Sequence, residues 1–178
     1  MQPSVLGSKD GRIGDLGSLG VRFMVGGDQS GGGFSLVEHP LAPRMLAAPM
    51  HRHSREDEYS FVLEGRVGAL LGDAVVYGEP GDLIFKPRNQ WHTFWNAGDK
   101  PARILEIISP AGFERFFAEL LEPASPDAPR ATLAARYGLE IDLDSVADCS
   151  RRMDSDSAPP SNQRSVRDEF RATFGLWI

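Results

Sequence analysis

The sequence predicts a mostly β domain, built as a sandwich or barrel, with a helical C-terminal extension. The chain has 178 residues, of which 41% are hydrophobic, so it suits one domain with a proper core and an appended tail. Its 19 glycines and 13 prolines are typical of many short strands joined by turns. Strand candidates recur about every eight to twelve residues, which is the spacing of sandwiches and barrels.

The strand candidates define the boundaries of the β domain. Residues 1–20 are rich in Gly, Ser and Asp, so we expect an irregular N-terminal arm. Residues 21–110 form the predicted β-barrel domain, because apolar runs alternate there with turns that contain Gly, Pro or Asn. The expected strands are residues 21–26, 34–39, 44–53, 58–63, 66–71, 74–77, 83–85, 91–95 and 102–108.

Residues 111–178 form the predicted helical and partly mobile extension. Four apolar side chains with three- and four-residue spacing predict an amphipathic helix, namely Phe113, Phe116, Phe117 and Leu120. We expect two further helices, at residues 130–137 and 142–151. Residues 154–163 are polar and contain prolines, so we expect them to be mobile.

Charge and cysteine content exclude several classes of protein. The net charge of -6, the pI near 5.2 and the lack of a clustered basic stretch argue against a nucleic-acid partner. No leader-like segment and no run of about eighteen apolar residues is visible, so we expect neither a signal peptide nor a membrane span. Cys149 is the single cysteine and cannot form an intrachain disulfide. We therefore expect a cytoplasmic protein.

The stretch APMHRHSREDEYSFVLEG contains two histidines and then a cluster of acids. His51 and His53 are two residues apart, so both point to one face of a strand. Neutral imidazole is a good ligand for divalent transition metals. The polar residues after His53 allow the chain to turn, so Glu58 can begin the next strand facing the same interior. Glu56 is the one residue that competes with Glu58 for this role if the turn is shorter.

The same parity gives the strand after Glu58 an apolar outer row. Ser60 and Val62 are expected to face inward, whereas Tyr59, Phe61 and Leu63 face outward. A row of large apolar side chains needs a cover. We expect either a helix at residues 112–121 or a partner subunit to provide it.

A second stretch, GDLIFKPRNQWHTFWN, supplies a third histidine. Parity along its second strand places His92 and Phe94 inside the barrel. Trp91 and Trp95 are assigned to an outer face or an interface. The remaining histidine, His39, is expected at the surface or at a strand end.

The spacing in these stretches resembles the two motifs of the cupin superfamily of small β-barrels. The first motif is Gly, five residues, His-x-His, three or four residues, Glu, six residues, Gly. His51, His53, Glu58 and Gly65 fit it, and Met45 replaces the leading glycine.

The second motif is Gly, five residues, Pro-x-Gly, two residues, His, three residues, Asn. Gly81, Pro87, His92 and Asn96 fit it. Asn89 stands where the family has glycine, and asparagine tolerates a left-handed backbone better than other residues with a side chain.

The resemblance covers residues 34–108 and implies a jelly-roll barrel of about six to eight strands, often dimeric. It also implies a divalent metal (Fe, Mn, Ni, Cu or Zn) held by His51, His53, Glu58 and His92. The chain resembles the quercetin-dioxygenase-like group of cupins, and this resemblance implies a dioxygenase acting on a small chelating substrate, with Glu58 also accepting a proton. The alternatives are a non-catalytic small-molecule-binding module and a metal-assisted isomerase or decarboxylase. We expect a homodimer.

Two further sets of residues have open roles at this stage. Met45, Ala47, Pro49 and Phe94 have inward parity, which predicts core packing, with the lining of a substrate pocket as the alternative. One charged group from Arg22, Arg103 and Glu106 can orient a substrate at the barrel mouth, although solvated edge positions are the simpler expectation.

Overall fold

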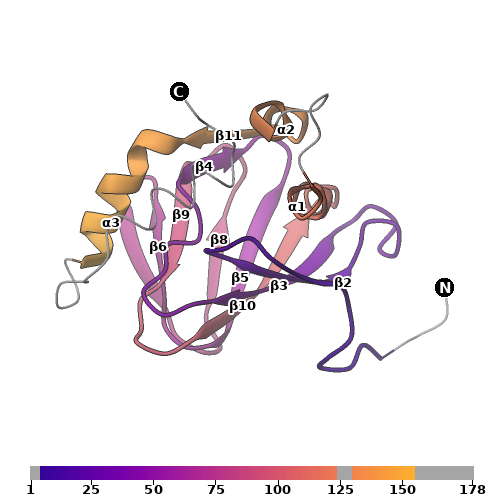
Figure 1. Ribbon diagram of the computed structural model, residues 1–178, viewed down its shortest axis with the longest axis horizontal. Coiled ribbons are helices and arrows are strands. Elements are labelled where there is room, and N and C mark those ends of the chain that lie inside the picture. The colour runs from indigo at the N-terminus through magenta and orange to yellow at the C-terminus, as the bar shows by residue number, and fades with distance from the viewer. Residues whose placement is uncertain (1–4, 124–129, 155–178) are drawn as a thin grey trace.

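The structure is a computed structural model that describes residues 5–123 and 130–154. Two antiparallel sheets face each other as a jelly roll (Figure 1). The first sheet has the strand order β1 (Ile13–Asp15), β2 (Gly20–Val25), β3 (Ser35–Leu41), β10 (Ala102–Ser109), β5 (Asp57–Glu64) and β8 (Leu83–Lys86). The second has the order β11 (Leu139–Asp142), β4 (Met50–His53), β9 (His92–Asn96), β6 (Val67–Leu71) and β7 (Ala74–Gly78). The mostly β prediction is confirmed.

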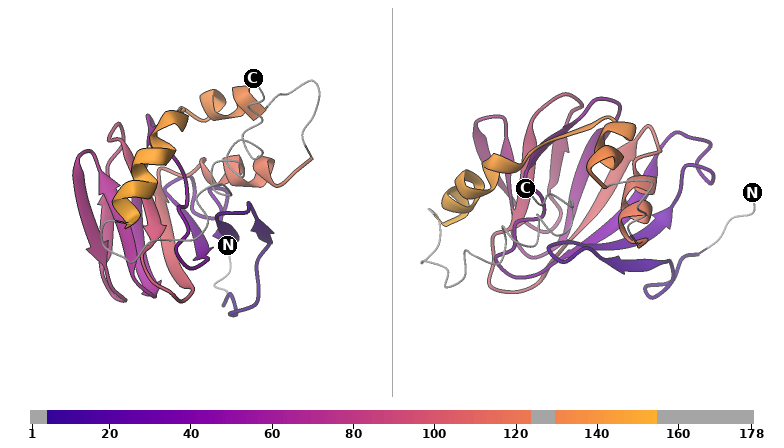
Figure 2. Two further views of the ribbon diagram at one scale, coloured as in Figure 1. Left: turned by 60° about the vertical axis from the view of Figure 1, so that its left-hand side comes forward. Right: turned by 45° about the horizontal axis from the view of Figure 1, so that its top comes forward.

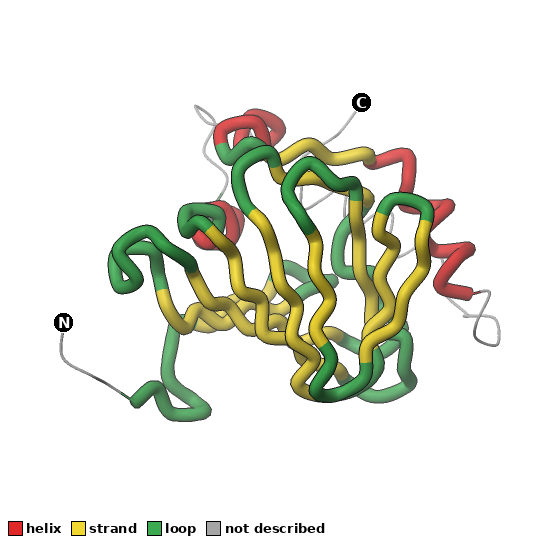
Figure 3. The backbone as a smooth tube through the Cα atoms, turned by 180° about the vertical axis from the view of Figure 1, so that it is seen from behind, coloured by secondary structure: helices red, strands yellow, loops and turns green. Residues whose placement is uncertain are grey.

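The helices lie at the periphery of the two sheets (Figure 3). They are α1 (Glu114–Leu120), α2 (Arg130–Arg136), the short 3₁₀ helix η1 (Leu143–Ser145) and α3 (Val146–Asp154). All three helices expected in the extension are therefore present. None of the helices in the described parts of the chain is long and apolar enough to span a membrane.

Helix α3 covers the outer face of the second sheet (Figure 2). Val146 and Cys149 pack there in one apolar cluster with Leu46, Leu70 and Trp95. Trp95 therefore lies on the outer face, as parity predicts, and is nevertheless buried. The cysteine has a structural role in this cluster, because its thiol is buried among apolar side chains.

The alternation expected for β5 is confirmed. Ser60 and Val62 are buried inside the barrel, whereas Phe61 is 36% exposed and Leu63 is 37% exposed. The expectation that a helix at residues 112–121 covers this outer row is wrong. Helix α1 joins the apolar core within the barrel instead, where Phe117 packs edge-to-face on His39 with ring centroids 5.1 Å apart.

Two strands lie in ranges for which no strand was expected. β1 falls within residues 1–20 and pairs with β2. β11 follows α2 and pairs with β4, so that Leu139 lies opposite His53 and Ile141 lies opposite His51. The C-terminal extension thus adds a strand beside the strand that carries two of the histidines. The expectation for residues 154–163 falls outside the described residues except for Asp154, which ends α3.

Candidate metal centre

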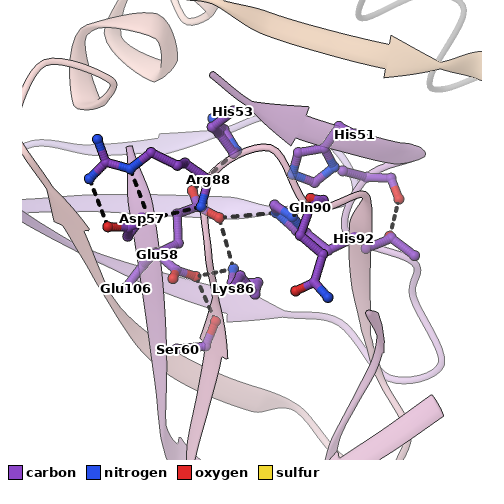
Figure 4. A network of polar contacts seen from close by, with 12 residues as sticks. His51, His53, Asp57, Glu58, Ser60, Lys86, Arg88, Gln90, His92 and Glu106 are labelled. Atoms are coloured by element: carbon purple, nitrogen blue, oxygen red, sulfur yellow. Dashed lines mark hydrogen bonds and ion pairs between the residues drawn. The ribbon is translucent and has the colours of Figure 1, made fainter. Parts of the chain in front are cut away.

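Four side chains from both sheets meet inside the barrel (Figure 4). β4 supplies His51 and His53, β5 supplies Glu58 at its second residue, and β9 supplies His92 at its first. One ligand atom from each of the four lies within 4.8 Å of the others, and all four residues are buried. The residues that the sequence singles out are therefore one cluster with the donor set of a divalent-metal site.

Backbone carbonyls fix the orientation of two of the rings. Nδ1 of His51 lies 2.8 Å from the Pro49 carbonyl oxygen, and Nδ1 of His92 lies 3.0 Å from that of Gln90. A carbonyl oxygen only accepts, so each Nδ1 carries the proton and donates it. The neutral rings therefore present an Nε2 lone pair, which is the form in which imidazole binds a metal.

The Nε2 atoms of His53 and His92 face the carboxylate of Glu58. Nε2 of His53 lies 3.4 Å from Oε1, and Nε2 of His92 lies 3.2 Å from Oε2. Both Nε2 atoms are buried without a hydrogen-bond partner. Nε2 of His92 only accepts and so has no favourable contact with a carboxylate oxygen, and both ring nitrogens of His53 are buried without a partner, which is costly. A cation bound by these ring nitrogens and by Glu58 would supply the missing partner, so the residues present fit a divalent metal.

The ionisation states agree with ligation. The pKa of His53 is lowered to about 4, chiefly because burial disfavours the charged ring. Burial also lowers the pKa of His51, and the neighbouring histidines add to the effect. Burial raises the pKa of Glu58, but His53 and Lys86 outweigh it, so the pKa lies well below its usual range. Near pH 7 these groups are neutral rings and a carboxylate, and none needs to release a proton before it binds a metal.

A buried lysine beside Glu58 is the functional residue that sequence reasoning misses. Lys86 is 1% exposed, and its Nζ lies 3.0 Å from Oε2 of Glu58 and 2.9 Å from Oε2 of Glu106. The expected strand at residues 83–85 stops one position short of it. Extending that strand by one residue gives Lys86 the same inward parity as Ile84, which is a signal that the sequence contains.

A largely apolar cavity adjoins the cluster. Phe113, Phe116, Phe117 and Leu120 of the α1 region form part of its wall, together with Phe94 from β9. Ala47 and Pro49 line it as well, so the pocket alternative for these inward positions is supported. The complete lining is Leu16, Ser18, Leu19, His39, Ala47, Ala48, Pro49, His51, His53, Glu58, Phe94, Glu106, Phe113, Phe116, Phe117, Leu120, Leu139 and Ile141.

The expectation that His39 lies at the surface is wrong. His39 is 1% exposed and lines the cavity. Its Nδ1 donates to the carbonyl oxygen of Gly20 at 2.8 Å, and burial lowers its pKa to about 4. The ring is therefore neutral near pH 7. It points inward because β3 has its own two-residue alternation, in which Val37, His39 and Leu41 share one face.

The acids between the two ligand strands take different positions. Glu56 is buried, and burial raises its pKa to about 7. It is nevertheless outside the four-residue cluster, which contains Glu58. Asp57 forms an ion pair with Arg88 at 2.7 Å, and Arg88 closes the turn that leads to His92.

Of the three charged residues considered for the barrel mouth, one lines the cavity. Arg22 pairs with Glu38 at 2.7 Å, and Arg103 pairs with the same carboxylate at 2.8 Å. Glu106 is buried inside the barrel and lines the cavity. No arginine or lysine lines the cavity in the part of the chain that the structure describes.

The match to a known family agrees with this geometry. Residues 38–108 match the family described as Cupin domain. This range contains all four residues of the cluster, so the match supports the resemblance to the cupin superfamily. None of the curated proteins compared with the chain matches it.

Solved structures share the fold at low sequence identity. KdgF from Halomonas sp. has a TM-score of 0.56 and 15% identity, over 64% of this chain and 99% of that chain. A predicted oxalate decarboxylase from Thermotoga maritima has a TM-score of 0.57 and 16% identity, over 60% and 99%. A variant of Streptomyces PAC13 with uridine has a TM-score of 0.52 and 14% identity, over 65% and 88%. At these identities the likeness concerns the fold alone.

Proposed function

We propose that this protein is a metal-dependent oxygenase, of dioxygenase type, that acts on a small apolar molecule able to chelate the metal. The observation that carries the proposal is the arrangement of the cavity. Its lining combines His51, His53 and Glu58 of the four-residue cluster with the aromatic side chains of the α1 region. A chelating head group fits the first part, and an apolar body fits the second.

The charges at the site favour a singly charged head group. A divalent ion with three neutral imidazoles and one carboxylate has a net charge of about +1. Lys86 and Glu106 offset each other at 2.9 Å. Without an arginine or lysine in the described lining, a phosphate or dicarboxylate lacks a second cationic partner. Enolates and singly ionised catechols meet these conditions.

The residues have separate roles in this proposal. His51, His53, Glu58 and His92 would hold the metal, which would supply about two open positions, either for a chelating substrate or for a substrate bound through one atom together with dioxygen. Glu58 is the proposed acceptor of the proton that the substrate loses on binding, because it is the one carboxylate of the cluster. The apolar wall orients the substrate and excludes water.

The test is anaerobic loading of the full chain with Fe, Mn, Ni, Cu or Zn, one at a time. Oxygen uptake is then measured with a panel of apolar 1,3-diketones and catechols. We expect at least one metal and substrate pair to consume oxygen faster than the free metal does, and His92→Ala to remove the excess. Uptake no faster than free metal across the panel contradicts an oxygenase. Thermal stabilisation by the same compounds without turnover identifies instead a non-catalytic binding module.

One observation favours a metal-assisted isomerase or decarboxylase as the second candidate. Such chemistry needs an acid or base besides Glu58. Glu106 lines the cavity, and burial raises its pKa to about 7, although Lys86 opposes the shift. A predicted oxalate decarboxylase and a nucleoside dehydratase are among the structures with a similar fold. Product formation from 2-oxo acids without oxygen, lost in Glu106→Gln, distinguishes this candidate.

A further inference from the structure

Lys86 occupies a position that lysine rarely takes. Fully buried lysines are uncommon unless they are paired, and this one has two carboxylate partners. Its Nζ lies 3.0 Å from Oε2 of Glu58 and 2.9 Å from Oε2 of Glu106 (Figure 4). It also lies 4.6 Å from the ring centroid of Phe94. The side chain is therefore enclosed and has a defined direction.

The sheet register places the partners of Lys86. Glu58 and Lys86 are direct partners in the register of β5 and β8, and Glu106 and Ser60 are direct partners in that of β10 and β5. Ser60 Oγ donates to Oε2 of Glu106 at 2.8 Å. The four side chains thus form a continuous polar row on the inner face of three neighbouring strands. Glu106 and Ser60 thus fix the ammonium group of Lys86, and Glu58 extends from this row toward the histidines.

We propose that Lys86 is a positioning residue that holds Oε2 of Glu58 and leaves Oε1 as the single oxygen through which Glu58 binds the metal. The inference rests on the proposed metal site. An oxygen that accepts a charge-assisted hydrogen bond from an ammonium group is a poorer metal ligand than its free neighbour. Glu106 and Ser60 hold Lys86 in this position.

The consequence concerns the number of open metal positions. Three histidines and one carboxylate oxygen occupy four of about six octahedral positions and leave two for a chelating ligand. If Glu58 binds through both oxygens, a single position remains, and a ligand can no longer chelate. Lys86 thereby determines that the site accepts bidentate ligands, although it does not line the cavity in the described structure.

The test compares two ligands on the cobalt-loaded full chain. Acetohydroxamate binds through two oxygens and azide through one nitrogen. The variant is Lys86→Met with Glu106→Gln, because removing Lys86 alone leaves buried carboxylates without a cation. We expect acetohydroxamate to bind about 10- to 100-fold more weakly than to the wild type, azide to bind as before, and the Co²⁺ absorption spectrum to change. The matched control is Arg22→Met with Glu38→Gln, a buried ion pair elsewhere, which should change neither.

The outcomes separate this inference from the proposed metal site. If the wild type binds no Co²⁺, the metal site and the inference both fail. If the wild type binds Co²⁺ but the variant keeps the wild-type spectrum and ligand preference, with a lower melting temperature only, the metal site stands and the inference is wrong.

A second measurement needs no Lys86 variant. Wild-type protein labelled with ¹³C-glutamate is loaded with Zn²⁺, and Glu58→Gln identifies the Glu58 bands in its infrared spectrum. We expect the wide carboxylate splitting of one-oxygen ligation. The narrow splitting of two-oxygen ligation overturns the proposal.

Discussion

His51 and His92 are direct partners in the antiparallel register of β4 and β9, with ring centroids 4.3 Å apart. The pairing explains how two stretches that are far apart in the sequence form one site. Each stretch contributes a strand, and the register brings the first residue of β9 to the second residue of β4. The strand pairing of the second sheet therefore decides whether the site exists.

Replacing either member of this pair should remove the metal. We expect His51→Ala and His92→Ala to weaken binding of Zn²⁺ by more than about 100-fold, because a lost ligand costs more than a lost supporting group. Chelator competition measures the affinity, and elemental analysis measures the metal that remains after purification. His39→Asn is the matched control, since His39 is buried in the same cavity but lies outside the cluster. Full metal content in either alanine variant contradicts the assignment of the ligands.

The turn before His92 contains the residue that departs from the cupin motif. Asn89 has a φ of 65°, in the left-handed region that the sequence predicts, and its N–H donates to the carbonyl oxygen of His53 at 2.7 Å. We expect Asn89→Ala to lower the free energy of unfolding by about 1 kcal/mol, since alanine tolerates this region poorly. Asn89→Gly should retain wild-type stability. Urea unfolding tests both, and equal losses in the two variants would mean that the backbone conformation is not the cause.

Much of the fold and of the site can be predicted from the sequence, because the side chains of a strand with one buried face alternate between inward and outward positions. The inward positions of β5 and the ligand set of the first motif come from this alternation. Pairing between strands is different, since it depends on residues far apart in the chain. Lys86 is the single charge of β8, and Glu106 lies between apolar residues of β10, and nothing local in the sequence indicates that they neutralise each other. β11 was missed for the same reason, because its partner is β4.

His39 should make the protein sensitive to acid. Its pKa is near 6.5 when exposed and about 4 in the folded protein, so the unfolded state binds more protons between these values. The stability is therefore complete above pH 6.5 and falls as the pH drops toward 4. Between pH 7 and pH 5 we expect the wild type to lose about 2 kcal/mol more than His39→Asn does. Denaturant unfolding at several pH values provides the measurement.

The wild type must be compared with His39→Asn, because other buried groups also make the folded protein less stable in acid. Burial also lowers the pKa of His51 and His53, so both proteins should lose stability in acid. The difference between the two slopes of unfolding free energy against pH gives the contribution of His39. Parallel pH profiles for the wild type and His39→Asn contradict the prediction.

The outer apolar row beside β8 gives the expected homodimer a testable surface. Tyr59 stacks on Phe85 with ring centroids 4.8 Å apart, Phe85 is 46% exposed and Leu83 is 54% exposed. β8 ends the first sheet in the described structure, and apolar rows on an edge strand favour association. We expect Phe85→Glu to convert a dimer into a monomer in light scattering, because a buried carboxylate there would lack a partner. Val75→Glu, at an exposed apolar position of β7, should leave the dimer intact. A wild type that is monomeric at all concentrations, or a dimer that survives Phe85→Glu, contradicts this surface.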